Sequence, residues 1–310
     1  MHTALFSVSF AGLWGQERLT LEQSIDLAAD LGYEGIEIMG KRPHLSILDY
    51  SLDDCRRLRD QVERRGLRVA AVAAYTDFTA GASAGEVPLG EMQVAYIGEL
   101  ARRAALLDCD LLRVFTAYEH DGASFMAQWR QTVDALLASG DLAADAGVQI
   151  GVQNHHDLAV DTKALIELLA QVDRPNISPM FDCWSAHLRG EDVAAGAARL
   201  AAQMRFTTVA DYVVLPRWKY QPHLVNYAAA QPPAVFAVPI GEGDLPYEAF
   251  LGALQSNGFE GWVSYEMCSP LRGGGSLDTL KQYARGFLEY MIRFAGVTRG
   301  PIPDHQERVP

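Results

Sequence analysis

Short apolar segments rich in β-branched residues alternate with longer amphipathic segments along almost the whole 310-residue chain. Repeated strand-then-helix alternation is typical of βα units that build a parallel sheet. The first complete unit shows the signals in order: Thr20 can cap a helix, with Gln23 completing a capping box, and Gly32 is expected to end that helix. Residues 35–39 then form a strand.

The alternation predicts eight strands and eight helices. Strands are expected at 5–10, 35–39, 67–75, 111–116, 148–153, 177–181, 206–209 and 261–265, and helices at 21–31, 52–65, 89–107, 124–146, 162–171, 191–203, 247–256 and 277–294. Eight βα units predict a (β/α)8 TIM barrel. A doubly wound sheet is the alternative, but no Gly-x-Gly-x-x-Gly follows the first strand. We expect one barrel domain over 1–297, a long insertion between strands seven and eight, and an extended tail at 298–310.

Composition restricts the partners and the environment. The chain has 26 basic and 39 acidic residues, and a net charge of −13 disfavours nucleic acids and anionic membranes as partners. Four cysteines without a Cys-x-x-Cys pair are typical of reduced thiols in an intracellular protein. No apolar run reaches the length of a membrane span. A signal peptide has basic residues before its apolar segment, and none precedes the apolar start of this chain. We therefore expect a cytoplasmic protein.

Polar residues that follow the strands are the candidates for an active site, because TIM barrels place their active sites at the carboxyl ends of the strands. Asp182 and Glu266 each end an otherwise apolar strand. Two carboxylates that converge in the barrel mouth repel each other unless a positive charge lies between them, and a divalent cation would supply it. The alternative is that each is solvated or pairs with a neighbouring arginine. Further polar residues at strand ends include Glu37 and Thr208, as candidates for substrate binding.

The densest polar cluster at a strand end is Gln153-Asn-His155-His156-Asp. Side chains alternate along a strand, so an inward Gln153 brings His155 to the same side. A neutral imidazole can bind a metal or transfer a proton near neutral pH, which makes His155 and His156 candidate catalytic residues. The alternative is a polar loop in which His155 bonds to the backbone.

The insertion at 212–243 combines aromatic and basic residues. Arg217 and Lys219 alternate with Trp218 and Tyr220. Long loops in compact domains are often functional, and this combination suits a sugar or a phosphorylated ligand. The alternative is a surface used for contacts between subunits of a homo-oligomer.

Six short segments, in this order along the chain, resemble the sugar phosphate isomerase/epimerase family of xylose isomerase-like TIM barrels. They are Gly32-Tyr-Glu-Gly-Ile-Glu37, Gln153-Asn-His155, Phe181-Asp182, Thr208-Val-Ala-Asp211, Gly241-Glu-Gly243 and Ser264-Tyr-Glu266. The resemblance extends from about Ala4 to Phe294. It implies a barrel of that superfamily.

The resemblance also implies a divalent metal, manganese, cobalt, magnesium or zinc, held in the family by Glu, Asp, His and Glu. Asp182 and Glu266 match two of these ligands, whereas Gln153 stands in place of the first Glu and Thr208 in place of the His. Gln153, Asp182 and Glu266 are thus the implied metal ligands. Because two positions differ, we expect weaker metal binding than in the family.

The implied reaction begins with removal of a proton next to a carbonyl, assisted by the metal. Glu266 is the expected base, and His155 or His156 assists. Only one of the family's two proton-exchanging glutamates remains, so a symmetric two-glutamate epimerisation is not expected. We therefore expect an isomerase or epimerase of a sugar or cyclitol. The alternatives are a lyase or dehydratase acting by β-elimination on a keto-sugar or keto-inositol, and an inactive sugar-binding barrel or assembly subunit.

Overall fold

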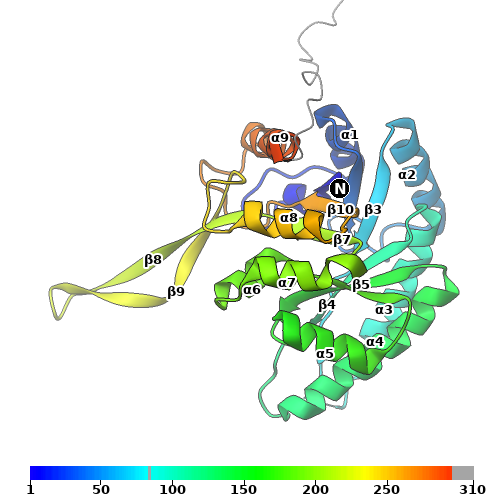
Figure 1. Cartoon of the computed structure of the whole chain (residues 1–310), viewed down its shortest axis with the longest axis horizontal. Coiled ribbons are helices and arrows are strands. Elements are labelled where there is room, and N and C mark those ends of the chain that lie inside the picture. Colours follow the sequence, from blue (N-terminus) through cyan, green and yellow to red (C-terminus); the bar gives the residue numbers. More distant parts are fainter. Residues whose placement is uncertain (83–84, 295–310) are drawn as a thin grey trace, which may run out of the picture.

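The computed structural model describes residues 1–82 and 85–294, and the expected tail at 298–310 lies outside them. Eight parallel strands form one sheet that curves into a nearly closed barrel, and helices cover its outer surface (Figure 1). The strands are β1 His2–Phe6, β2 Gly35–Met39, β3 Arg68–Ala73, β4 Leu111–Ala117, β5 Gln149–His156, β6 Ile177–Met180, β7 Phe206–Val209 and β10 Trp262–Tyr265. The prediction of a TIM barrel is confirmed.

The helices follow the strands in sequence. They are α1 Leu21–Leu31, α2 Leu52–Arg64, α3 Leu89–Leu106, α4 Phe125–Asp145, α5 Thr162–Val172, α6 Cys183–Leu188, α7 Val193–Leu200, α8 Tyr247–Ser256 and α9 Leu277–Phe294. The capping box of α1 is present, because the Thr20 hydroxyl accepts from the Gln23 backbone N–H and the Gln23 side chain accepts from the Thr20 N–H. Gly32 ends α1 in the left-handed region, with φ of 92°.

The strand order is β6-β5-β4-β3-β2-β1-β10-β7, so β6 and β7 are the two strands at the ends of the ladder. The Thr207 hydroxyl on β7 donates to the Phe181 carbonyl directly after β6, at 2.8 Å. This side-chain bond bridges the gap between the two end strands. Because all eight strands are parallel, their carboxyl ends open on one face of the barrel.

Several elements differ from the expected ones. The first expected strand, 5–10, ends at Phe6, and Ser7–Phe10 form a 3-10 helix. The helix expected at 191–203 begins only at Val193, because the Asp192 side chain caps it. The short helix α6 was not expected; it begins directly after Asp182, whose carboxylate caps it.

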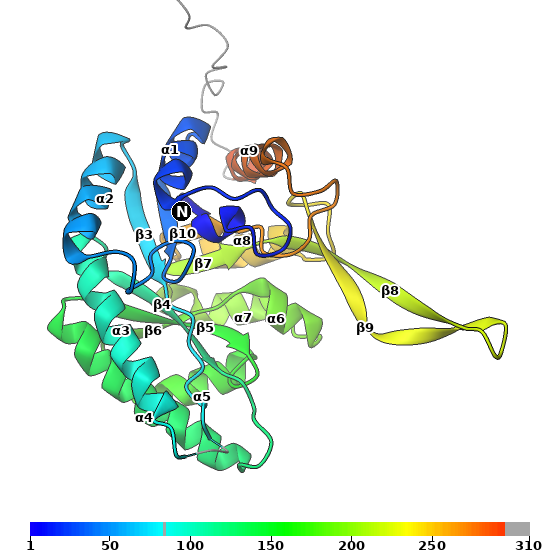
Figure 2. The same ribbon diagram turned by 180° about the vertical axis from the view of Figure 1, so that it is seen from behind.

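The expected insertion is present but is not an irregular loop. Strands β8 Asp211–Gln221 and β9 Asn226–Val238 pair antiparallel and form a hairpin. The hairpin projects away from the barrel, as the two opposite views show (Figures 1 and 2). Only its base lies against the barrel mouth.

Two expectations from composition are checked by the structure. All four cysteines are free, with Cys55, Cys109 and Cys183 buried and Cys268 partly exposed. Among residues 1–82 and 85–294, no helix has the length and apolar character needed to cross a bilayer.

Two segments that carry the family resemblance meet behind the barrel mouth. The buried Asp211 carboxylate, at the start of β8, accepts hydrogen bonds from the backbone N–H groups of Gly241 and Gly243 at 2.8 and 2.9 Å. A Cβ at Gly243 would lie 2.0 Å from Asp211 Oδ1 and 2.5 Å from the Tyr212 carbonyl oxygen. Gly243 therefore permits a close approach that no larger residue allows.

We predict that Gly243→Ala lowers the free energy of unfolding by about 1–3 kcal/mol, since the added methyl group has no room. Urea denaturation measures the change. The matched control is Gly252→Ala in α8, where an added Cβ meets no atom within 4 Å and a helix gains from alanine. Equal effects of the two substitutions would contradict the steric explanation.

Candidate active site at the barrel mouth

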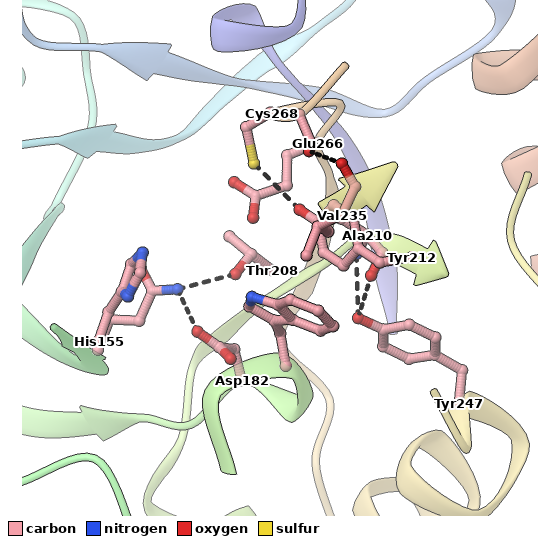
Figure 3. A pocket seen from close by; sticks show the side chains of 12 residues that line it. His155, Asp182, Thr208, Ala210, Tyr212, Val235, Tyr247, Glu266 and Cys268 are labelled. Atoms are coloured by element: carbon pink, nitrogen blue, oxygen red, sulfur yellow. Dashed lines mark hydrogen bonds between the residues drawn. The ribbon is translucent and has the colours of Figure 1, made fainter. Parts of the chain in front are cut away.

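A cavity of about 290 Å³ opens at the carboxyl ends of β5, β6, β7 and β10 and extends to the base of the β8–β9 hairpin. Figure 3 shows His155, Asp182, Thr208 and Glu266 around this cavity. Its lining residues are Gln153, His155, Asp182, Trp184, Thr208, Ala210, Tyr212, Val235, Tyr247, Glu266, Cys268 and Ser269. Five predicted site residues, from strand ends far apart in the sequence, are thus brought together.

The Gln153 side-chain amide links two other strand ends. Its Nε2 donates to Asp182 Oδ2 at 2.5 Å and to Thr208 Oγ1 at 3.1 Å. Asp182 Oδ1 also accepts from the Ser185 backbone N–H at 3.3 Å, where α6 begins. Burial raises the pKa of Asp182, and the Gln153 hydrogen bond opposes this rise. The amide therefore holds the Asp182 carboxylate in a fixed orientation.

Glu266 follows β10 and is the cavity's second carboxylate. Burial raises its pKa to about 7; the Arg113 charge opposes the rise, and the nearby carboxylates of Glu37 and Asp182 add to it. A carboxyl group with a pKa near neutrality can both accept and release a proton under physiological conditions. Glu266 thus has the acid–base properties of a proton-transfer residue.

His155 and His156 lie differently. His155 lines the cavity, and its Nδ1 accepts from the His156 backbone N–H at 2.9 Å, so the neutral ring carries its proton on Nε2. Burial and the Arg113 charge lower the pKa of His155 to about 4, so the ring is neutral at pH 7. His156 has a positive φ of 71°, and its ring stacks on Tyr118 with centroids 4.0 Å apart. His156 is not among the residues that line the cavity.

Glu37 lies inside the barrel, where it pairs with an arginine that the sequence interpretation missed. Arg113 Nε on β4 lies 3.3 Å from Glu37 Oε1, and both side chains are at most 2% exposed. The guanidinium also lies over the rings of Phe6 and Phe115, 4.8 Å from each centroid. Neither Glu37 nor Arg113 lines the cavity. Their charges still affect the site, because Arg113 lowers and Glu37 raises the pKa of Glu266.

The two basic candidates of the insertion are not in the cavity. Arg217 and Lys219 lie on the exposed part of the hairpin, and an Arg217 guanidinium nitrogen donates to the Pro232 carbonyl at 2.9 Å. Their predicted contact with a substrate held by the same chain is therefore not supported.

Trp184, Tyr212 and Cys268 line the cavity but were not singled out from the sequence. Trp184 and Cys268 lie two positions after Asp182 and Glu266. The Tyr212 hydroxyl and Cys268 Sγ are hydrogen-bonded at 3.2 Å, and the rings of Trp184 and Tyr212 lie 4.4 Å apart. If the alternation of side chains along β10 is continued past Glu266, Cys268 points to the same side as Glu266, and this signal could have indicated it.

The residues at the strand ends do not fit the metal centre that the resemblance implies. Within the described parts of the chain, no three His, Cys, Asp or Glu side chains are grouped so that they could hold a metal ion. The Gln153 atom that faces Asp182 is an amide nitrogen, which cannot ligate a cation, and no imidazole occupies the position of Thr208.

Comparison with known proteins gives consistent matches. A family model described as xylose isomerase-like TIM barrel matches residues 25–289. An inosose dehydratase of Geobacillus thermodenitrificans (strain NG80-2) is 24% identical over 267 residues, which cover 80% of this chain and 82% of that protein. A fructoselysine 3-epimerase of Shigella flexneri is 21% identical over 292 residues, which cover 89% and 93%.

Among solved structures, the IOLI protein with a binding zinc atom is similar to this chain with a TM-score of 0.71. The sequences are 16% identical, and the match covers 96% of this chain and 98% of the other. At this identity the likeness shows a shared fold.

Proposed function

Because the chain belongs to the family of xylose isomerase-like TIM barrels, we propose that it is an enzyme that removes the proton next to the carbonyl group of a sugar or cyclitol. The observation that carries this proposal is the position of Glu266. Its carboxylate lies at the end of a barrel strand, on a cavity large enough for a small polyhydroxylated molecule.

Three groups of the cavity have distinct proposed roles. Glu266 takes the proton from the carbon next to the carbonyl. The neutral His155 donates its Nε2–H to the carbonyl oxygen, where negative charge develops. Trp184 and Tyr212 offer aromatic surface to the apolar face of a sugar ring. Thr208, whose hydroxyl lines the cavity, is a further contact for substrate hydroxyl groups.

The number of bases limits the outcome of the reaction. Epimerisation by two bases needs a proton acceptor on each face of the substrate, and Gln153 cannot accept a proton as a glutamate would. A single base can return the proton to the neighbouring carbon while a proton moves between the two oxygens, which is an aldose–ketose isomerisation. The site therefore supports a one-base isomerase better than a two-base epimerase.

A second candidate is dehydration by β-elimination. Here Glu266 removes the proton and then returns it to the β-hydroxyl, so that the C–O bond breaks and water leaves. This reaction also needs only one base, and the inosose dehydratase that covers most of this chain favours it. Both candidates share the first step.

Proton exchange tests that shared step before the substrate is known. The protein is incubated in D2O with a panel of ketoses, aldoses and keto-inositols, and deuterium at the carbon next to the carbonyl is followed by NMR. Isomerisation yields the isomeric sugar, whereas elimination yields an enol or enone that absorbs in the ultraviolet. Binding of panel members without any exchange would instead support a sugar-binding barrel or assembly subunit.

We predict that the exchange rate rises with pH through about pH 7. Burial raises the pKa of Glu266 to about 7, and only the ionised form accepts a proton, so the active fraction increases as the pH passes that value. An ordinary glutamate would already be ionised at pH 6. A rate that is constant between pH 5.5 and about pH 8.5 would contradict the assignment of Glu266 as the base.

A further inference from the structure

We infer that the strand-end centre of this chain has no resident divalent cation, because the Gln153 amide occupies the space between Asp182 and Thr208. This inference rests on the proposed active site, but cation binding is measured without any assay of activity. The absence of a cation and the proposed reaction can therefore be disproved independently of each other.

The first argument is the pair of hydrogen bonds that Gln153 donates. Its side chain is 2% exposed, and its Nε2 donates to both Asp182 and Thr208. Both N–H groups of the amide are thus directed at the two oxygen atoms on either side. A cation between these oxygens would have to displace the amide and break both bonds.

The second argument is the set of hydrogen bonds around Asp182. One carboxylate oxygen accepts from Gln153 and the other from the Ser185 backbone N–H, so both oxygens have protein donors. The carboxylate also caps α6, and the Asp182 backbone N–H is held by Asn154 Oδ1 at 2.6 Å. The side chain is therefore occupied by structural hydrogen bonds.

The third argument is the positive charge of Arg113. Its guanidinium is buried inside the barrel and permanently charged, and it lowers the pKa of Glu37, Asp182 and Glu266 against the effect of burial. A positive charge thus already acts on the buried carboxylates. It would repel a second cation placed nearby.

The test compares the wild-type chain with a variant that restores the family's ligands. Protein expressed in medium with manganese and zinc, and purified without chelator, is analysed for metals and titrated with Mn²⁺ and Zn²⁺ by calorimetry. We expect less than about 0.1 equivalent in the wild type, and about one equivalent in Gln153→Glu/Thr208→His, with at least about 100-fold tighter binding.

Two results would overturn the inference. The first is a stoichiometric cation in the wild type that Asp182→Asn removes. The second is a folded double variant, checked by circular dichroism, that gains no affinity. Should the double variant not fold, the wild-type titration alone decides the question.

A different observation carries a second inference, about the β8–β9 hairpin. Trp218, Tyr220 and Tyr227 are 62%, 46% and 62% exposed. Trp218 pairs across the hairpin with Ala229, and Tyr220 with Tyr227, so these aromatic side chains share one face. A two-stranded hairpin is at best marginally stable in water, so an exposed aromatic face of this length needs a covering surface.

We propose that this aromatic face docks on a second copy of the same chain. The segment 212–238 contains Arg217 and Lys219 and no acidic residue, so all 39 acidic residues lie elsewhere in a chain of net charge −13. Arg217 and Lys219 alternate with Trp218 and Tyr220 along β8, so the basic side chains lie on the hairpin face opposite to the aromatic one. A second copy carries an excess of acidic residues that can pair with these basic side chains when the hairpin docks.

Sedimentation velocity over a concentration series tests the docking. We expect a dimer or larger homo-oligomer that high salt weakens, and whose dissociation constant rises at least about tenfold in Trp218→Ser/Tyr227→Ser. The matched control is Met126→Ser, which removes an exposed apolar side chain on α4. A monomeric wild type at about 100 µM, or an oligomer that the hairpin variant leaves unchanged, overturns the proposal.

Discussion

Glu266→Gln is expected to lower the rate of substrate proton exchange by about 10²- to 10⁴-fold. Glutamine keeps the size of the side chain at the end of β10, but its amide cannot accept a proton. No other carboxylate in the cavity is positioned to replace it, since Asp182 is held by Gln153 and by the Ser185 backbone. The measurement is deuterium incorporation by NMR, with the substrate found in the panel.

The matched control is Glu260→Gln. Glu260 is exposed and precedes β10, so the same substitution is made at the opposite end of the same strand. We expect full activity in this variant. If Glu266→Gln retained more than about a tenth of the wild-type rate, another group would have to be the base.

Much of the barrel could be predicted from the sequence because its signals are local. Residues 35–39 and 206–209 have the predicted strand bounds, and the box of Thr20 and Gln23 caps α1 as expected. The hairpin was expected as a loop, because its prolines and its exposed, mixed composition give no burial pattern. Its pairing depends on contacts between two strands, which a local pattern does not show.

The candidate site was predictable where side-chain alternation holds and not beyond that. Gln153 and His155 share the cavity as their spacing predicts, but the positive φ of His156 turns the chain and directs its ring to Tyr118. Arg113 gave no signal, because a single arginine inside an apolar strand does not reveal its partner. Glu37 lies two strands away, and only the closed barrel brings the pair together.

Arg113→Met is expected to lower the free energy of unfolding by about 3–5 kcal/mol, because it leaves the Glu37 carboxylate buried without a positive partner. The Arg113 charge opposes the burial-driven rise in the pKa of Glu37 more strongly than the Ser264 hydroxyl does, so the guanidinium is the main compensation for this buried carboxylate. Urea denaturation, followed by circular dichroism, measures the change. Methionine keeps most of the side-chain volume, so the loss reports the charge rather than a cavity.

Removing both charges separates the ion pair from packing. Glu37→Leu combined with Arg113→Met replaces the buried pair by apolar groups, and we expect its stability to lie close to that of the wild type or above it. The double-mutant cycle would then give a large coupling energy, as for two residues in direct contact. If the double variant is instead as unstable as the sum of its single substitutions, the two side chains act independently, and Arg113 stabilises the barrel through its contacts with Phe6 and Phe115.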